Sequence, residues 1–262
     1  MSPAPAPLPP GDVARLNFVL NLVYLGAQFH GQAVAQAPAS DLLTGVGRLG
    51  AVRGGHPVAF SDKVLDRYAS EAAGDSVAQI VALRRRLGSA TAAQPTLDLA
   101  PALRGPAGTD ARSNTVLDRS TSDRGYLLGA FFIGDTLPAV TRTLLADIAD
   151  AGAQTTLAGI LAHAIYHAGV VRTLLVMRAS ADPSIGEVAG LAGAMQRRLA
   201  GPDPEVVPEG ASADLMDIAG IPIPFFRSVN QVLRALTSSA NGPQTGGFFP
   251  SGINGVPPEL LR

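Results

Sequence analysis

The sequence predicts an all-α protein: a four-helix bundle with a long crossover between its second and third helices and a helical and irregular C-terminal extension. Apolar residues recur at helical spacing in four long segments. The second and third of these are separated by residues 89–124, which are rich in Pro, Thr, Ser and Gly, and a connection this long is typical of a crossover along a bundle. Hydrophobic residues make up 47% of the 262 positions, enough for a large core.

We expect three parts along the chain. Residues 1–11 alternate Pro with small residues and should be extended and polyproline-like. Residues 12–180 should form the bundle. Residues 181–262 are expected to supply one C-terminal helix and a Pro- and Gly-rich tail that wraps the bundle, with a second short helical piece inside the tail.

The first helix is expected from Asp12 to about Ala35, because apolar residues recur there every three or four positions in two neighbouring stripes. Other elements should therefore cover it on two sides. The first stripe contains Val13, Leu16, Leu20, Val23 and Ala27, and the second contains Phe18, Leu22, Leu25 and Phe29.

The remaining helices follow from capping residues and periodicity. Ser61-Asp62 should open the second helix and Gly88 should close it. Pro138 should kink or divide the third helix, because proline has no amide proton for the helical ladder. The expected spans of the later helices are Tyr126 to about Ala151, about Thr155 to Met177, Ser184 to Leu199, and Phe225 to Leu236.

Four segments together resemble the bacterial and plant ferritin-like proteins that include the desiccation-related proteins. The opening segment LNFVLNLVYLGAQFH, residues 16–30, is similar to the family's first helix, and DSVAQ, residues 75–79, to part of its second. AGILAHAIYHA, residues 158–168, resembles its fourth helix, and GGFFPSGING, residues 246–255, resembles its tail. The resemblance spans nearly the whole chain and implies a ferritin-like fold.

The resemblance also implies which residues stand at the family's di-iron ligand positions. Carboxylates are missing there, and only one histidine is retained. Helical periodicity turns the same residues toward the bundle axis. A di-iron centre needs several carboxylates to bridge and neutralise the ions, so we expect no di-iron site and no cofactor. The former metal-site positions are Val23, Ser76, Gln79, Ala164 and His167.

His163 and His167 remain an alternative metal site. They stand four positions apart on one helix, a spacing that can hold a single zinc or copper ion. A third ligand is not evident from the sequence. The competing interpretation is a pair of histidines satisfied in the core or at an interface.

Composition limits the partners and the compartment. The net charge of −1 does not favour nucleic acid or an anionic membrane. Charged residues make up only 16%, which suggests a homo-oligomer or an assembly partner. The apolar run from Thr155 to Met177 is helically patterned and includes Arg172, so we expect no membrane span. No signal peptide is evident, which predicts a cytoplasmic protein, or an exported one if a leader has been removed.

Three functions follow from these observations. The first is a non-catalytic ferritin-like protein with a structural, assembly or desiccation-related role. The second is a small-molecule binding module that uses space at mid-bundle, where Ser76, Gln79 and His167 could orient a ligand. The third is a mononuclear metal enzyme that uses His163 and His167.

Overall fold

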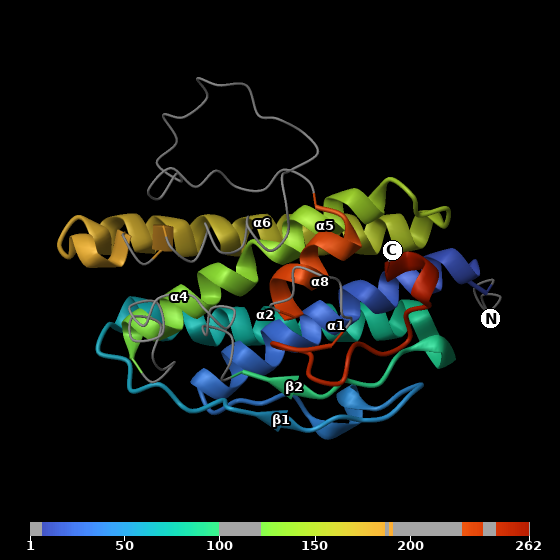
Figure 1. Cartoon of the computed structure of the whole chain (residues 1–262), viewed down its shortest axis with the longest axis horizontal. Helices are drawn as coiled ribbons and strands as arrows, with labels where there is room; N and C mark the ends of the chain where they lie inside the picture. Colours follow the sequence, from blue (N-terminus) through green and yellow to red (C-terminus); the bar gives the residue numbers. More distant parts are fainter. Residues whose placement is uncertain (1–6, 100–121, 187–188, 191–226, 238–244, 262) are drawn as a thin grey trace, which may run out of the picture.

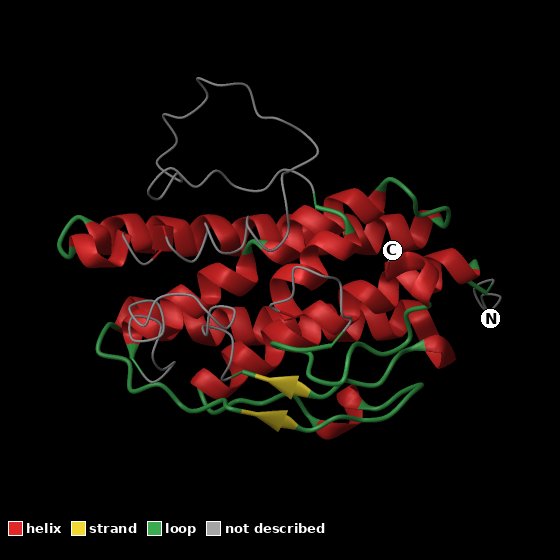
Figure 2. Ribbon diagram, viewed as in Figure 1, coloured by secondary structure: helices red, strands yellow, loops and turns green. Residues whose placement is uncertain are grey.

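The computed structural model describes residues 7–99, 122–186, 189–190, 227–237 and 245–261. Long helices dominate it, which confirms the all-α prediction (Figures 1 and 2). Two short strands pair in parallel through Val52–Leu97 and Arg53–Asp98. The helices are α1 (Pro10–Ala33), α2 (Lys63–Leu87), α4 (Asp123–Gly134), α5 (Thr136–Leu145), α6 (Ala151–Ala179) and α8 (Val229–Thr237); the strands are β1 (Val52–Arg53) and β2 (Leu97–Asp98); single 3-10 turns cover Ser40–Leu43, Gly88–Ala90 and Pro258–Leu261.

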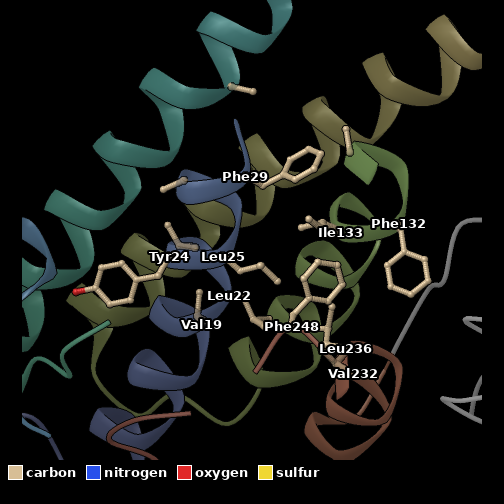
Figure 3. Close-up of a cluster of buried hydrophobic side chains, with 14 of the residues drawn as sticks. Val19, Leu22, Tyr24, Leu25, Phe29, Phe132, Ile133, Val232, Leu236 and Phe248 are labelled. Carbon is tan, nitrogen blue, oxygen red and sulfur yellow. The ribbon is translucent and has the colours of Figure 1, made fainter. Parts of the chain in front are cut away.

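Helix α1 lies at the centre of the fold and is buried on nearly every side. Its two apolar stripes explain this position, because each stripe needs its own covering layer. Figure 3 shows one of these layers, in which α1 residues such as Leu22 and Phe29 gather with side chains from α4, from α8 and from Phe248 of the tail. The expectation that α1 is covered on two sides is therefore confirmed.

The third predicted helix is divided in two near Asp135. Pro138 is the third residue of α5 and has no amide proton to donate to the carbonyl of Gly134, so the helix cannot continue unbroken. The Thr136 hydroxyl donates instead to the Ile133 carbonyl at 2.7 Å. The break ends α4 at Gly134, and α5 begins one residue after Asp135.

The predicted boundary between the third and fourth helices was wrong by several residues. Helix α5 ends at Leu145 rather than Ala151, and α6 begins at Ala151 rather than Thr155. Two carboxylates set this boundary. Asp150 accepts from the Ala153 amide at 2.7 Å, and the buried Asp12 of α1 accepts from the amides of residues 149 and 150. The cap from Asp12 is a contact across 138 positions that local periodicity does not reveal.

The ends of the chain differ in detail from prediction. Helix α1 begins at Pro10, since proline suits the first helical turn; residues 1–6 of the expected extended segment lie outside the described residues. Helix α8 begins at Val229 rather than Phe225, because Ser228 and Gln231 form a reciprocal cap: the Ser228 amide donates to Gln231 Oε1, and the Gln231 amide donates to Ser228 Oγ. Of the helix expected over 184–199, residues 184–186 and 189–190 are helical, and the rest lies outside the described residues.

The described part of the tail, residues 245–261, lies against α1. Asn21 of α1 exchanges two hydrogen bonds with the backbone of Asn254: its Nδ2 donates to the Asn254 carbonyl at 2.8 Å, and its Oδ1 accepts from the Asn254 amide at 3.1 Å. One turn earlier, Asn17 bonds in the same way to the Ala90 carbonyl and the Ala92 amide. These two side chains give the asparagines of the opening motif a structural role, since they satisfy extended backbone that has no strand partner there.

Helix α6 is long and apolar enough to cross a membrane by length and composition alone, and it is the one such helix in the described part of the chain. The same helix is fixed in the protein body by Arg172. That guanidinium is fully buried, pairs with the Asp135 carboxylate and lies 5.0 Å from the centre of the Phe131 ring. The buried ion pair therefore attaches α6 to the junction of α4 and α5.

Candidate functional site

The five positions predicted as former metal-ligand positions come from three helices of the bundle. Val23 of α1, Gln79 of α2 and Ala164 of α6 are buried, with 2%, 7% and 5% of their surface exposed. Ser76 of α2 and His167 of α6 are partly buried. Gly26, one turn from Val23, faces α2, since a side chain there would lie 3.8 Å from Ser76 Oγ. None of these positions holds a carboxylate, and His167 is the one with a titratable side chain.

Two of the three polar groups proposed to orient a small molecule bond to the protein itself. The Ser76 hydroxyl donates to the Ala72 carbonyl of its own helix at 2.7 Å. His167 Nε2 lies 3.0 Å from Asp75 Oδ2. Ser76 and His167 are thus used in local contacts, and binding of a small molecule by Ser76, Gln79 and His167 stays a prediction.

Asp75 was not among the predicted site residues. The structure places its carboxylate at the contact between α2 and α6. Asp75 Oδ2 lies 3.0 Å from His167 Nε2 and 4.0 Å from His163 Nδ1, and the His163 side chain is 52% exposed. Asp75 stands one turn before the buried Gln79, and this spacing was a signal that could have placed it beside α6.

A second polar contact lies one turn along α2 from Asp75. The Tyr166 hydroxyl donates to Glu71 Oε1 at 2.7 Å, and this bond raises the pKa of Tyr166. Both side chains are exposed. The two contacts, His167 with Asp75 and Tyr166 with Glu71, fix the register between α2 and α6.

His167 is a neutral hydrogen-bond donor in this arrangement. Burial lowers its pKa, and although Asp75 works in the opposite direction, the net shift is downward. A neutral ring donates from Nε2 to Asp75 and leaves Nδ1 as an acceptor. Nδ1 is buried, and no hydrogen-bond partner for it lies among the described residues. The ring is thus committed to Asp75 through Nε2.

Aromatic rings fill the bundle beside His167. The Tyr68 ring lies between two histidines, 5.8 Å from the ring centre of His167 and 6.4 Å from that of His30. His30 Nδ1 is 2.7 Å from the hydroxyl oxygen of Tyr126. Burial, with a smaller contribution from His167, lowers the pKa of His30 to about 3, so its ring is neutral at ordinary pH. His30 therefore belongs to an aromatic core cluster.

The residues present do not fit a carboxylate-bridged di-iron centre. Val23 and Ala164 carry no donor atoms, and Gln79 brings no negative charge. The nearby carboxylate of Asp75 is hydrogen-bonded to His167. His167 is the one residue at the predicted positions that could itself bind a metal as the family's histidine would. Among the described residues, no group of three or more His, Asp or Glu side chains is placed to hold a metal ion.

The comparisons with known proteins agree with this fold. A family model described as a ferritin-like domain matches residues 11–177, which run from the start of α1 nearly to the end of α6. No curated protein and no solved structure matches the chain. The match covers more than half of the sequence and the whole described bundle. The chain therefore belongs to the ferritin-like domain family.

Proposed function

We propose that the protein is a non-catalytic member of this family, with a lost di-iron site and a structural or assembly role carried out as a homo-oligomer. One observation carries the proposal: the positions predicted as former metal-ligand positions hold apolar or neutral residues, and Val23, Gln79 and Ala164 are buried. Burial of two divalent cations among such groups is strongly unfavourable, because no negative charge compensates for the lost hydration.

The packing around these positions supports a structural role. The interior beside His167 is occupied by Tyr68, His30 and Tyr126, whose rings contact one another and whose polar atoms include a hydrogen bond between His30 and Tyr126. Rigid, well-packed rings stabilise a bundle. Where these aromatic side chains pack, the bundle lacks the set of charged metal ligands on which oxidation chemistry at a di-iron centre depends.

A role in desiccation or a related stress is the more specific form of the proposal. It draws on the resemblance of residues 246–255 to the tail of desiccation-related proteins. In this protein the tail bonds to the central helix through Asn254 and Asn21, and the Phe248 and Phe249 rings are buried. A tail fixed in this way favours a stable scaffold that holds its shape when water is scarce.

Elemental analysis tests the proposal. The full chain is produced with iron and manganese supplements, purified without chelators and analysed for iron, manganese, zinc and copper beside a His167→Ala variant. We expect far less than one iron or manganese per chain in both proteins. Stoichiometric iron or manganese in the native chain that falls in the variant overturns the proposal. Stoichiometric zinc or copper that disappears in His163→Ala and His167→Ala replaces it with the mononuclear site.

A further inference from the structure

The outward face of α6 carries no charged residue along nearly its whole length. Asp, Glu, Lys and Arg are absent from every exposed position of this helix, although exposed helix faces are normally rich in them. The basic residue at the centre of the helix, Arg172, is buried instead. The exposed residues are Ala151, Gly152, Gln154, Thr155, Ala158, Gly159, Ala162, His163, Ile165, Tyr166, Thr173 and Met177, and we call them the α6 outer face.

Large apolar side chains of this face are in contact with water. Ile165 is 58% exposed, Tyr166 is 48% exposed and Met177 is 66% exposed. Only one third of the most apolar stretch of α6 is buried in the protein. An apolar surface of this length on a soluble protein marks an interaction site, because water solvates it poorly.

A lipid bilayer suits this face less well than a protein surface. The face offers no Lys or Arg to anionic headgroups, and the exposed His163, Thr155 and Thr173 are polar. The opposite side of α6 is fixed in the bundle by the buried ion pair of Arg172 with Asp135, so the helix cannot leave the protein body to enter a membrane. The occupant is therefore expected to be another protein surface that is also uncharged.

The shape of the face is complementary to itself. Ala158, Gly159 and Ala162 form a shallow centre, and a side chain added at Gly159 would meet nothing within 4 Å. Ile165 and Tyr166 stand about one turn further along and project from the surface. If two copies of α6 cross antiparallel with a two-fold axis at Ala162, then Ile165 of one copy faces Gly159 of the other and Tyr166 faces Ala158, and both contacts occur twice.

We propose that α6 pairs antiparallel with α6 of a second copy of this chain about a two-fold axis near Ala162. This inference rests on the assembly role proposed above and assigns the surface that performs it. The hydrogen bond of Tyr166 to Glu71 supports the arrangement, because it holds one of the projecting rings in place before the copies meet.

The available area is sufficient for a specific dimer of modest affinity. A helix of 29 residues is about 43 Å long, and a contact strip about 10 Å wide covers roughly 430 Å² per copy. Gly74 and Ala78 of α2 are exposed beside Asp75, which contacts α6, and they extend the strip. The total for both copies is then roughly 1,000 Å², at the lower limit for specific interfaces, where weak and reversible association is expected.

Sedimentation of the full chain from about 1 to about 100 µM tests the surface. We expect a monomer–dimer equilibrium, and Ile165→Arg should raise the dissociation constant by about 100-fold or more, because the dimer would bury two unpaired guanidinium groups. The control is Leu49→Arg: Leu49 is 47% exposed in the loop before β1, on the other side of the fold from α6 (Figure 1). The control should dimerise like the native chain.

Cysteine crosslinking tests the axis, and the native chain helps because it contains no cysteine. Ala162→Cys should form a disulfide-linked dimer under mild oxidation, since the two sulfurs meet at the axis. Thr173→Cys is the matched control on the same face. It lies 11 positions from Ala162, so its two copies should be about 33 Å apart and should not crosslink. Thr173→Cys mixed with Ala151→Cys should crosslink.

Four results overturn the inference. They are a monomer at every concentration, a dimer indifferent to Ile165→Arg, crosslinking of Thr173→Cys without Ala162→Cys, and cosedimentation of the native chain with phosphatidylcholine vesicles that Ile165→Arg abolishes. The metal analysis is independent of these readouts. A monomer that binds no metal therefore refutes the pairing of α6 helices and leaves the non-catalytic role standing. A dimer that binds stoichiometric iron refutes the non-catalytic role and leaves the pairing of α6 helices standing.

Discussion

His30 should make the stability of this protein fall steeply in mild acid. Its ring is partly buried beside Tyr126 and Tyr68, and the loss of hydration there lowers its pKa from 6.5 to about 3. Below pH 6.5 the unfolded chain therefore takes up a proton at this residue that the folded chain does not accept. Because the unfolded state binds more protons, the free energy of unfolding decreases as the pH falls from 6.5 toward 3.

The size of the effect follows from the two pKa values. Each pH unit between 3 and 6.5 costs about 1.4 kcal/mol of stability, so about 2–3 kcal/mol is lost at about pH 4.5. The proposed change is His30→Gln, since glutamine is neutral at every pH and its amide can still bond to the Tyr126 hydroxyl. The variant should lose about 2–3 kcal/mol less than the native chain between neutral pH and about pH 4.5.

Urea denaturation at both pH values, followed by circular dichroism, measures this difference. The comparison between proteins removes the contribution of all other titrating groups that the two share. His56→Gln serves as the control, because His56 is exposed in a loop and its replacement should leave the native pH dependence unchanged. If His30→Gln loses as much stability on acidification as the native chain does, the assignment of His30 as a partly buried neutral ring is wrong.

Two further changes test the packing of the core. Asp135→Ala removes the carboxylate that pairs with the buried Arg172 and should lower the free energy of unfolding by about 3–5 kcal/mol; a loss below about 1 kcal/mol in urea denaturation would contradict a buried pair. Gly129→Ala places a methyl group about 2.6 Å from the Phe29 ring and should cost about 1–3 kcal/mol, whereas Gly74→Ala meets nothing and should gain up to about 1 kcal/mol. The packing around these glycines would be refuted if both glycine variants shifted the melting temperature of the protein in the same direction.

Helical periodicity was sufficient for the long helices because their apolar faces are set by local spacing. The two stripes of α1 indicated its central position, and Pro138 indicated the division of the third helix. The boundary near residue 150 was missed, since Asp12 fixes it from a distant part of the sequence. Local pattern cannot show a cap supplied by another helix.

The candidate site was only partly predictable for a related reason. Periodicity placed Val23, Gln79 and Ala164 on inward faces, and these residues are buried. Asp75 was not predicted as a site residue, whereas its carboxylate lies 3.0 Å from His167 Nε2 of α6. Charge alone does not distinguish a residue at the centre of an exposed face from one at its edge, where a neighbouring helix can reach it.

The bonds between Asn21 and Asn254 have a consequence for how the protein is made. They join positions 233 residues apart, so α1 completes its contacts only after Asn254 has been synthesised and brought back to it. Contacts of such long range slow folding, because a long loop must close before they form. Until then the Asn21 amide has no tail to bond, at a cost of about 1–3 kcal/mol if it is buried. The packing of α1 is therefore complete only when residues 245–261 lie against it, which makes this contact a late step of folding.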